Sequence, residues 1–95
     1  MYETLLSMPL KLQMQNIGAE VSRMVRFMQI KPERAFSRGQ EAIKMLKILA
    51  NDPNVHVRKV EFERMAEEID DYLKGGEKWD INVELMLRQY EIFNE

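Results

Sequence analysis

Apolar residues recur every three or four positions along the first third of the chain, and this spacing constrains the fold more than any other feature. The residues in this run are Leu10, Met14, Ile17, Val21, Met24 and Met28. Such steps place side chains on one face of a helix that turns every 3.6 residues. The predicted helix spans residues 8–30, with Ser7 as its N-cap and Pro9 in its first turn. It ends before Lys31, because a residue that precedes proline disfavours the helical conformation.

Three further segments show helical periodicity and are separated by short turn signals. The predicted helices cover residues 32–51, 56–74 and 81–94. Pro32 suits the first position of the second helix, and Asn51-Asp52-Pro53 stops that helix. Gly75-Gly76 ends the third helix, because glycine readily adopts the left-handed conformation of a helix C-terminus. Asp80 or Asn82 is predicted to cap the last helix.

The chain has 95 residues, which suffice for one domain but leave no separate core for a second. No segment alternates polar and apolar residues over a useful length, so no sheet is predicted. Short links force successive helices to pack side by side in opposite directions. The sequence therefore predicts an all-α fold, an antiparallel up-down four-helix bundle with short loops that forms a single domain over residues 1–95.

Composition excludes several classes of protein. The chain contains no cysteine, which rules out disulfides, thiol catalysis and cysteine-bound zinc and fits a reducing cytoplasm. No apolar run approaches the roughly 20 residues needed to span a bilayer. The opening Met1-Tyr2-Glu3 lacks the basic start and apolar block of a signal peptide. We therefore expect a cytoplasmic protein with no membrane association.

Catalytic and metal-binding patterns are also missing. His56 is the only histidine, and a metal site built on histidine recruits several ligands. It is interpreted as structural or exposed, the alternative being a charge switch near neutral pH. The acidic run between Glu61 and Asp71 reads as a solvated helix face, because a di-metal bundle would also need Glu-x-x-His pairs. Neither a nucleophile elbow nor a phosphate-binding loop occurs. We predict no catalytic, cofactor-binding or metal-binding residues, no cofactor, and a protein that is not an enzyme.

Charge is divided unevenly along the chain. Residues 1–50 hold eight Lys or Arg against four acidic residues, and residues 51–95 hold six against twelve. The first interpretation is that two halves of one bundle complement each other. The second is a basic face for an acidic partner or for nucleic acid. The residues of that candidate nucleic-acid patch are Arg23, Arg26, Lys31, Arg34 and Arg38.

The segment IGAEVSRMVRF, residues 17–27, interrupts a strong helix with small residues. Gly18 and Ser22, together with Gly39 in the second helix, are predicted to form a seam where helices pack closely. Asn16, Glu20 and Arg23 form a polar border of that seam, and Glu20 and Arg23 are spaced to pair along the helix. If this border faces another helix, the pair fixes the packing register. With Trp79, these three residues are candidate partner contacts.

Several stretches carry a resemblance to a known family. They are Asn16-Ile17-Gly18-Ala19-Glu20-Val21-Ser22-Arg23, Ala35-Phe36, Ala42-Ile43, Ala50-Asn51-Asp52-Pro53, the Arg64–Tyr72 helix and Tyr90-Glu91-Ile92-Phe93. On these residues the chain resembles a small family of bacterial all-helical proteins to which no activity is assigned. More loosely, the layout is similar to HEPN-like helical partners of minimal nucleotidyltransferases in toxin–antitoxin pairs. The resemblance implies an all-helical single domain and assigns no functional residue.

The function expected from these observations is a non-catalytic protein-interaction module that associates with itself or with the product of a neighbouring gene. The alternative is an RNA- or DNA-binding protein, or a toxin–antitoxin accessory protein, that uses the basic patch. The pathway and the identity of the partner are not encoded in any recognisable motif.

Overall fold

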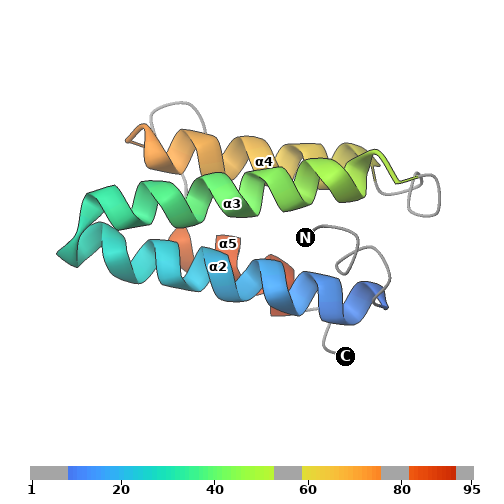
Figure 1. The fold of residues 1–95 in the computed structure, drawn as a ribbon, viewed down its shortest axis with the longest axis horizontal. Helices are drawn as coiled ribbons and strands as arrows, with labels where there is room; N and C mark the ends of the chain where they lie inside the picture. The colour runs from blue at the N-terminus through green and yellow to red at the C-terminus, as the bar shows by residue number, and fades with distance from the viewer. Residues whose placement is uncertain (1–8, 53–58, 76–81, 92–95) are drawn as a thin grey trace.

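The protein is described here by a computed structural model that covers residues 9–52, 59–75 and 82–91. These residues form four helices and contain no strand, so the all-helical prediction is confirmed for the described part of the chain (Figure 1). The helices are α2 (Leu10–Ile30), α3 (Pro32–Ala50), α4 (Lys59–Leu73) and α5 (Val83–Glu91). None of the described helices combines the length and the apolar composition that crossing a membrane requires.

The start of α2 differs from the prediction. The helix begins at Leu10 rather than at residue 8, because the extended backbone of Pro9 (φ −57°, ψ 148°) makes this proline the N-cap. The predicted cap Ser7 lies outside the described residues, and no side chain caps this end of α2. Lys31 is extended (φ −140°, ψ 85°), as its position before Pro32 requires, and it separates α2 from α3 by a single residue.

The other described helix ends lie close to the turn and capping residues that were predicted from the sequence. α3 stops one residue before the predicted end, and the Asn51 side chain donates to the Lys47 carbonyl oxygen at 2.8 Å. α4 ends before Gly75, whose φ of +109° is the left-handed conformation that favours glycine. Asn82 caps α5, because its Oδ1 accepts from the Leu85 backbone N–H at 3.1 Å. The predicted boundaries at residues 56, 81 and 94 fall outside the described residues.

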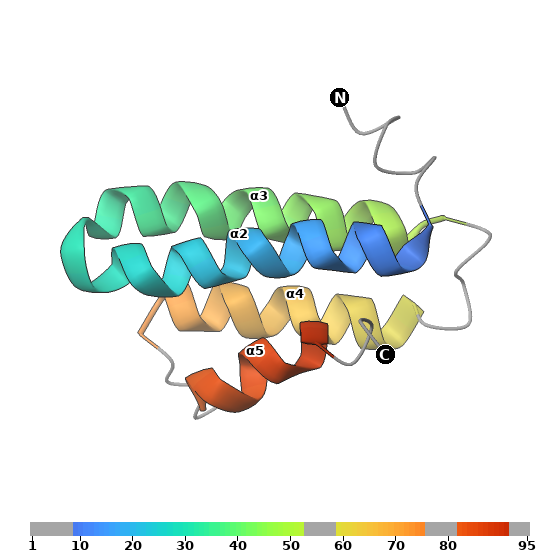
Figure 2. The same ribbon diagram turned by 90° about the horizontal axis from the view of Figure 1, so that it is seen from below.

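Among the described residues, three helix pairs make the main packing contacts. α2 packs along α3, α3 packs along α4, and the shorter α5 lies against α2. Figure 1 shows α2 and α3 side by side and running in opposite directions, and Figure 2 shows α4 and α5 on the far side of that hairpin. The core lies between the hairpin and these two helices.

Sixteen apolar residues of the described chain are buried and form one cluster. The largest that are fully buried are Phe62, Met14, Ile17, Met24, Leu46, Leu49, Ile69, Met86 and Val21. Burial of each large side chain contributes roughly 1.5–3 kcal/mol relative to its exposed state. The cluster draws on all four helices, so the three-and-four spacing of apolar residues is what joins them.

Two glycines set how closely the helices approach. A Cβ atom built on Gly18 would lie 2.9 Å from Tyr90 Cβ, so α5 rests directly on the α2 backbone. A Cβ atom on Gly39 would lie 2.6 Å from Leu73 Cδ1 and 2.8 Å from Met24 Sδ. Gly18 therefore brings α5 close to α2, and Gly39 leaves room for side chains from α2 and α4.

Candidate interaction surface

The corner between α2 and α3 gathers the basic residues that the sequence singled out. Arg23 and Arg26 occupy the last two turns of α2, Lys31 is the linking residue, and Arg34 and Arg38 occupy the first two turns of α3. All five are exposed. The single-residue link between the helices places these cations at one end of the hairpin, and we call this set the basic corner.

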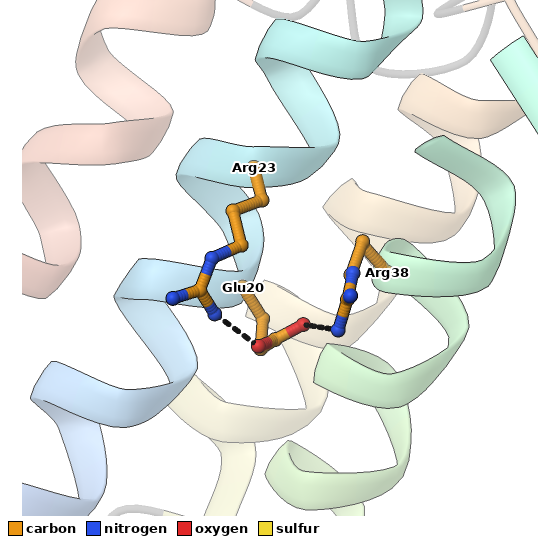
Figure 3. Close-up of polar contacts among 3 residues, drawn as sticks. All are labelled: Glu20, Arg23 and Arg38. Atoms are coloured by element: carbon orange, nitrogen blue, oxygen red, sulfur yellow. Dashed lines mark hydrogen bonds and ion pairs between the residues drawn. The ribbon is translucent and has the colours of Figure 1, made fainter. Parts of the chain in front are cut away.

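Glu20 pairs with two of these cations and offsets one positive charge. Arg23 Nη1 donates to Glu20 Oε1 at 2.6 Å within α2, and Arg38 Nη1 donates from α3 to Glu20 Oε2 at 3.3 Å (Figure 3). The Glu20 side chain is only 13% exposed, whereas both arginines are about half exposed. The carboxylate thus connects α2 to α3. Because the arginines are solvated, each pair contributes about 0–1 kcal/mol.

Arg34 makes a different contact across the same corner. Its guanidinium carbon lies 5.9 Å from the centroid of the Phe27 ring on α2. A cation held over an aromatic face gains about 0.5–1 kcal/mol at an exposed site. The contact covers part of Phe27 and holds the Arg34 side chain against the hairpin.

Arg26 and Lys31 form no ion pair with any residue that the structure describes. Arg34 has no ion pair among these residues either, so Arg26 and Lys31 are the two cations of the basic corner that have neither an ion pair nor an aromatic contact there. Exposed, uncompensated cations attract any anionic group, whether a carboxylate or a phosphate. Of the five predicted patch residues, two are paired, one is stacked on an aromatic ring and two are left to act on a partner.

Of the three residues of the predicted packing seam, only the two glycines lie where helices pack closely. Gly39 is buried and Gly18 lies under Tyr90, but Ser22 is exposed. Ser22 sits one turn after Gly18 at the edge of a groove between α2 and α5, so it borders the close approach without taking part in it. Asn16, in the polar border, is also exposed on α2.

A second surface feature, which was not predicted from the sequence, is a groove between α3 and α4 with a volume of about 450 Å³. The residues that line it are Gln40, Ile43, Lys47, Ala50, Asn51, Glu63, Ala66, Glu67 and Asp70. The α3 and α4 residues of this groove recur at helical spacing. That spacing was visible in the sequence, but only tertiary packing shows that the two rows face each other.

The acidic run of α4 is not solvated along its whole length. Glu61, Glu63 and Glu67 are exposed as expected, whereas Asp71 is buried. Glu68 is largely covered, accepting from Gln89 Nε2 of α5 at 3.0 Å and lying 3.8 Å from Arg64. Glu68 thereby links α4 to α5. Within the described residues, no three His, Cys, Asp or Glu side chains are arranged to hold a metal ion.

Tyr90 is the most perturbed titratable residue of the described chain. Burial raises the pKa of its phenol well above 10, and the nearby Glu68 carboxylate raises that pKa further. The hydroxyl is buried without a hydrogen-bond partner among the described residues. A buried, neutral phenol of this kind serves packing, and here it anchors α5 on Gly18.

His56 and the candidate contact Trp79 lie outside the described residues. Comparison of the chain with protein-family models, with curated proteins and with solved structures found no match. The candidate interaction surfaces are therefore defined by this structure alone. They are the basic corner, where Glu20 pairs with two arginines, and the groove between α3 and α4.

Proposed function

We propose that the protein is a non-catalytic, cytoplasmic protein-interaction module that associates with copies of itself. Its scaffold is an antiparallel up-down helical bundle, and its working surfaces are the outer sides of the helices. The resemblance to bacterial all-helical proteins fits this scaffold and adds no activity.

The observation that carries the proposal is the apolar surface that the helices leave in water. Five large apolar side chains of the described residues are exposed, namely Leu12, Ile30, Phe36, Val60 and Leu85. Single exposed apolar residues are ordinary, but several on helix faces of so small a chain favour a partner that covers them. Small domains also gain stability from association, because they bury a limited share of their own surface.

The contacts that the cations of the basic corner already make favour a protein partner over nucleic acid. Glu20 neutralises part of the charge of Arg23 and Arg38, and a carboxylate within the patch repels phosphate. Within the described residues, Phe27 is the only aromatic side chain stacked with these cations, and Arg34 already covers part of it. Protein interfaces readily use arginines that are held in place by such contacts.

Size-exclusion chromatography with light scattering tests self-association directly. The expected result is a mass above that of one chain that rises with protein concentration. A mass of one chain at high micromolar concentration overturns the proposal.

Nucleic-acid binding is the second candidate, and the uncompensated Arg26 and Lys31 favour it. Gel shifts with short RNA and DNA duplexes at low and moderate salt separate the two functions. Phosphate-driven binding weakens steeply as salt rises, because it releases counterions. Absence of a shift at low salt eliminates this candidate.

A further inference from the structure

Two faces of the molecule carry apolar side chains and opposite charges. The first is the outer side of α2, where exposed residues recur at helical spacing. Its members are Leu12, Ala19, Arg23, Arg26 and Ile30. Steps of seven, four, three and four keep these side chains on one side of the helix. We call this the α2 face, and its charge is positive.

The second face is the groove between α3 and α4. Ile43, Ala50 and Ala66 supply its apolar lining, and Glu63, Glu67 and Asp70 supply three carboxylates along the α4 side. Lys59 and Lys74 lie near two of these carboxylates, at 4.0 Å from Glu63 and 3.0 Å from Asp70. Glu67, in the middle of the row, forms no ion pair within the described residues. Lys47 lines the α3 side of the groove and forms no ion pair within the described residues either. The α4 row therefore has a carboxylate without an ion pair at its middle position, Glu67.

Exposed apolar side chains extend the rows of the groove at both ends. Phe36 lies four residues before Gln40 on the α3 row and is 54% exposed. Val60 lies three residues before Glu63 on the α4 row and is 78% exposed. The contact of Gly39 with Leu73 places the start of α3 beside the end of α4, so Phe36 and Val60 lie toward opposite ends of the groove.

The α2 face has the same layout with the charges inverted. Leu12 and Ile30, exposed by 45% and 67%, stand near its two ends, with small Ala19 and two arginines between them. Four of the five large apolar residues exposed in the described chain thus lie on these two faces. An elongated helix face of this kind fits a groove between two helices, and opposite charges align the two surfaces.

We propose that the α2 face of one copy docks in the α3–α4 groove of a second copy, with Arg26 opposite Glu67. This inference rests on the proposed self-association and specifies its surfaces. The two faces are different patches of the same chain, so the contact is heterologous. After docking, one copy keeps its groove free and the other keeps its α2 face free, so the assembly can grow into a ring or an open chain.

Charge reversal tests the pairing. Arg26→Glu and Glu67→Arg, each made alone, should weaken self-association at least about tenfold, because like charges then oppose each other. The double variant R26E/E67R should recover association, because the exchanged charges attract again. An equimolar mixture of the two single variants should also associate, since one unaltered face is available on each chain.

Matched controls place the same changes of charge elsewhere. Lys44→Glu lies on an exposed part of α3 that does not line the groove, and Glu61→Arg lies on the opposite side of α4 from the groove. Both should associate as the wild type does. If Arg26→Glu fails to show a wild-type melting curve, Ile30→Ser tests the α2 face without changing its charge.

Sedimentation velocity gives the readout, and its outcomes are distinct. If the wild-type protein and Glu67→Arg associate equally well, the docking proposal is wrong, but the proposed self-association is supported. Failure of R26E/E67R to recover association, when both single variants have lost it, also overturns the specific pairing. A wild-type protein that stays monomeric overturns both proposals.

Discussion

Replacing Gly18 by alanine should destabilise the protein, whereas the same replacement at Gly39 should be nearly neutral. Both glycines lie inside helices, so alanine gains roughly 1 kcal/mol of helix propensity at either position. Any difference between the variants therefore reports on packing.

The two positions differ in what the new methyl group meets. At Gly18 it would lie 2.9 Å from Tyr90 Cβ, about 0.5 Å closer than ordinary van der Waals contact. Tyr90 Cβ is bonded to the α5 backbone and does not move when the side chain rotates, so α5 itself must shift. Overpacking of this kind costs roughly 1–3 kcal/mol. After the gain in propensity, the expected net loss of stability is about 0–2 kcal/mol.

At Gly39 the nearest atoms are the far ends of Leu73 and Met24, at 2.6 and 2.8 Å. These distances are shorter, yet both side chains end in atoms that a rotation displaces. A rotamer adjustment costs on the order of 0.5–1.5 kcal/mol, which the gain in helix propensity approximately offsets. The expected change in the free energy of unfolding is therefore within about 0.5 kcal/mol of zero.

Thermal unfolding followed by circular dichroism separates these cases, because 1 kcal/mol shifts Tm by about 4–8 °C in a domain of this size. Ser22→Ala is the matched control, an exposed position one turn beyond Gly18 that reports propensity without packing. If Gly18→Ala melts at or above the temperature of Gly39→Ala and Ser22→Ala, α5 is not packed tightly on the α2 backbone. Gly18→Leu should lower Tm further than Gly18→Ala, because the added bulk must also enter the space held by Tyr90.

Three other substitutions probe polar contacts. Tyr90→Phe should leave stability unchanged or raise it by about 1 kcal/mol in urea titrations, because it removes a buried hydroxyl that has no partner in the described structure; a loss above about 1 kcal/mol would reveal a partner for that hydroxyl. The pKa of Tyr90 is higher in the folded protein than in the unfolded chain, so the wild type should keep its stability below pH 10. Above pH 10 its free energy of unfolding should fall by up to about 1.4 kcal/mol per pH unit, and Tyr90→Phe should flatten this decline. Glu20→Gln should cost about 1 kcal/mol or less, and the cost should shrink with added salt; an unchanged melting curve at low salt would mean that the two arginine pairs contribute nothing. Asn82→Ala should cost about 1 kcal/mol through loss of the α5 cap, a result contradicted if Asn82→Ala and Asn82→Ser unfold at the same urea concentration.

Much of the fold follows from local rules that act on neighbouring residues. The apolar stripe of α2, the extended Lys31 before Pro32, and the turn at Gly75 each depend on a few adjacent positions. The start of α2 was predicted two residues early, because a proline can occupy either the first turn or the cap and only the backbone geometry decides between them. Several neighbouring residues can cap the same helix end, and composition alone does not decide which of them does. Helix boundaries are therefore predicted less accurately than the helices themselves.

The surface shows where sequence reasoning reaches its limit. Helical spacing correctly suggested that Glu20 and Arg23 can pair, because residues three apart on a helix are neighbours. It did not include Arg38 in that pair, since the contact joins residues eighteen apart in the chain. The groove between α3 and α4 was missed for the same reason, because its two walls come from different helices.

The sequence by itself determined that the described chain is helical, that a break falls at Lys31 before Pro32, and which side of each helix is apolar. These properties depend on backbone sterics and on the spacing of apolar residues, both of which can be read from a short segment of the sequence. Only the tertiary structure decided that Gly18 receives Tyr90, that Glu20 joins two arginines from different helices and that a groove lies beside an acidic row. Each of these depends on the rotation and register of packed helices, which are set by the fit of the whole core rather than by any one segment.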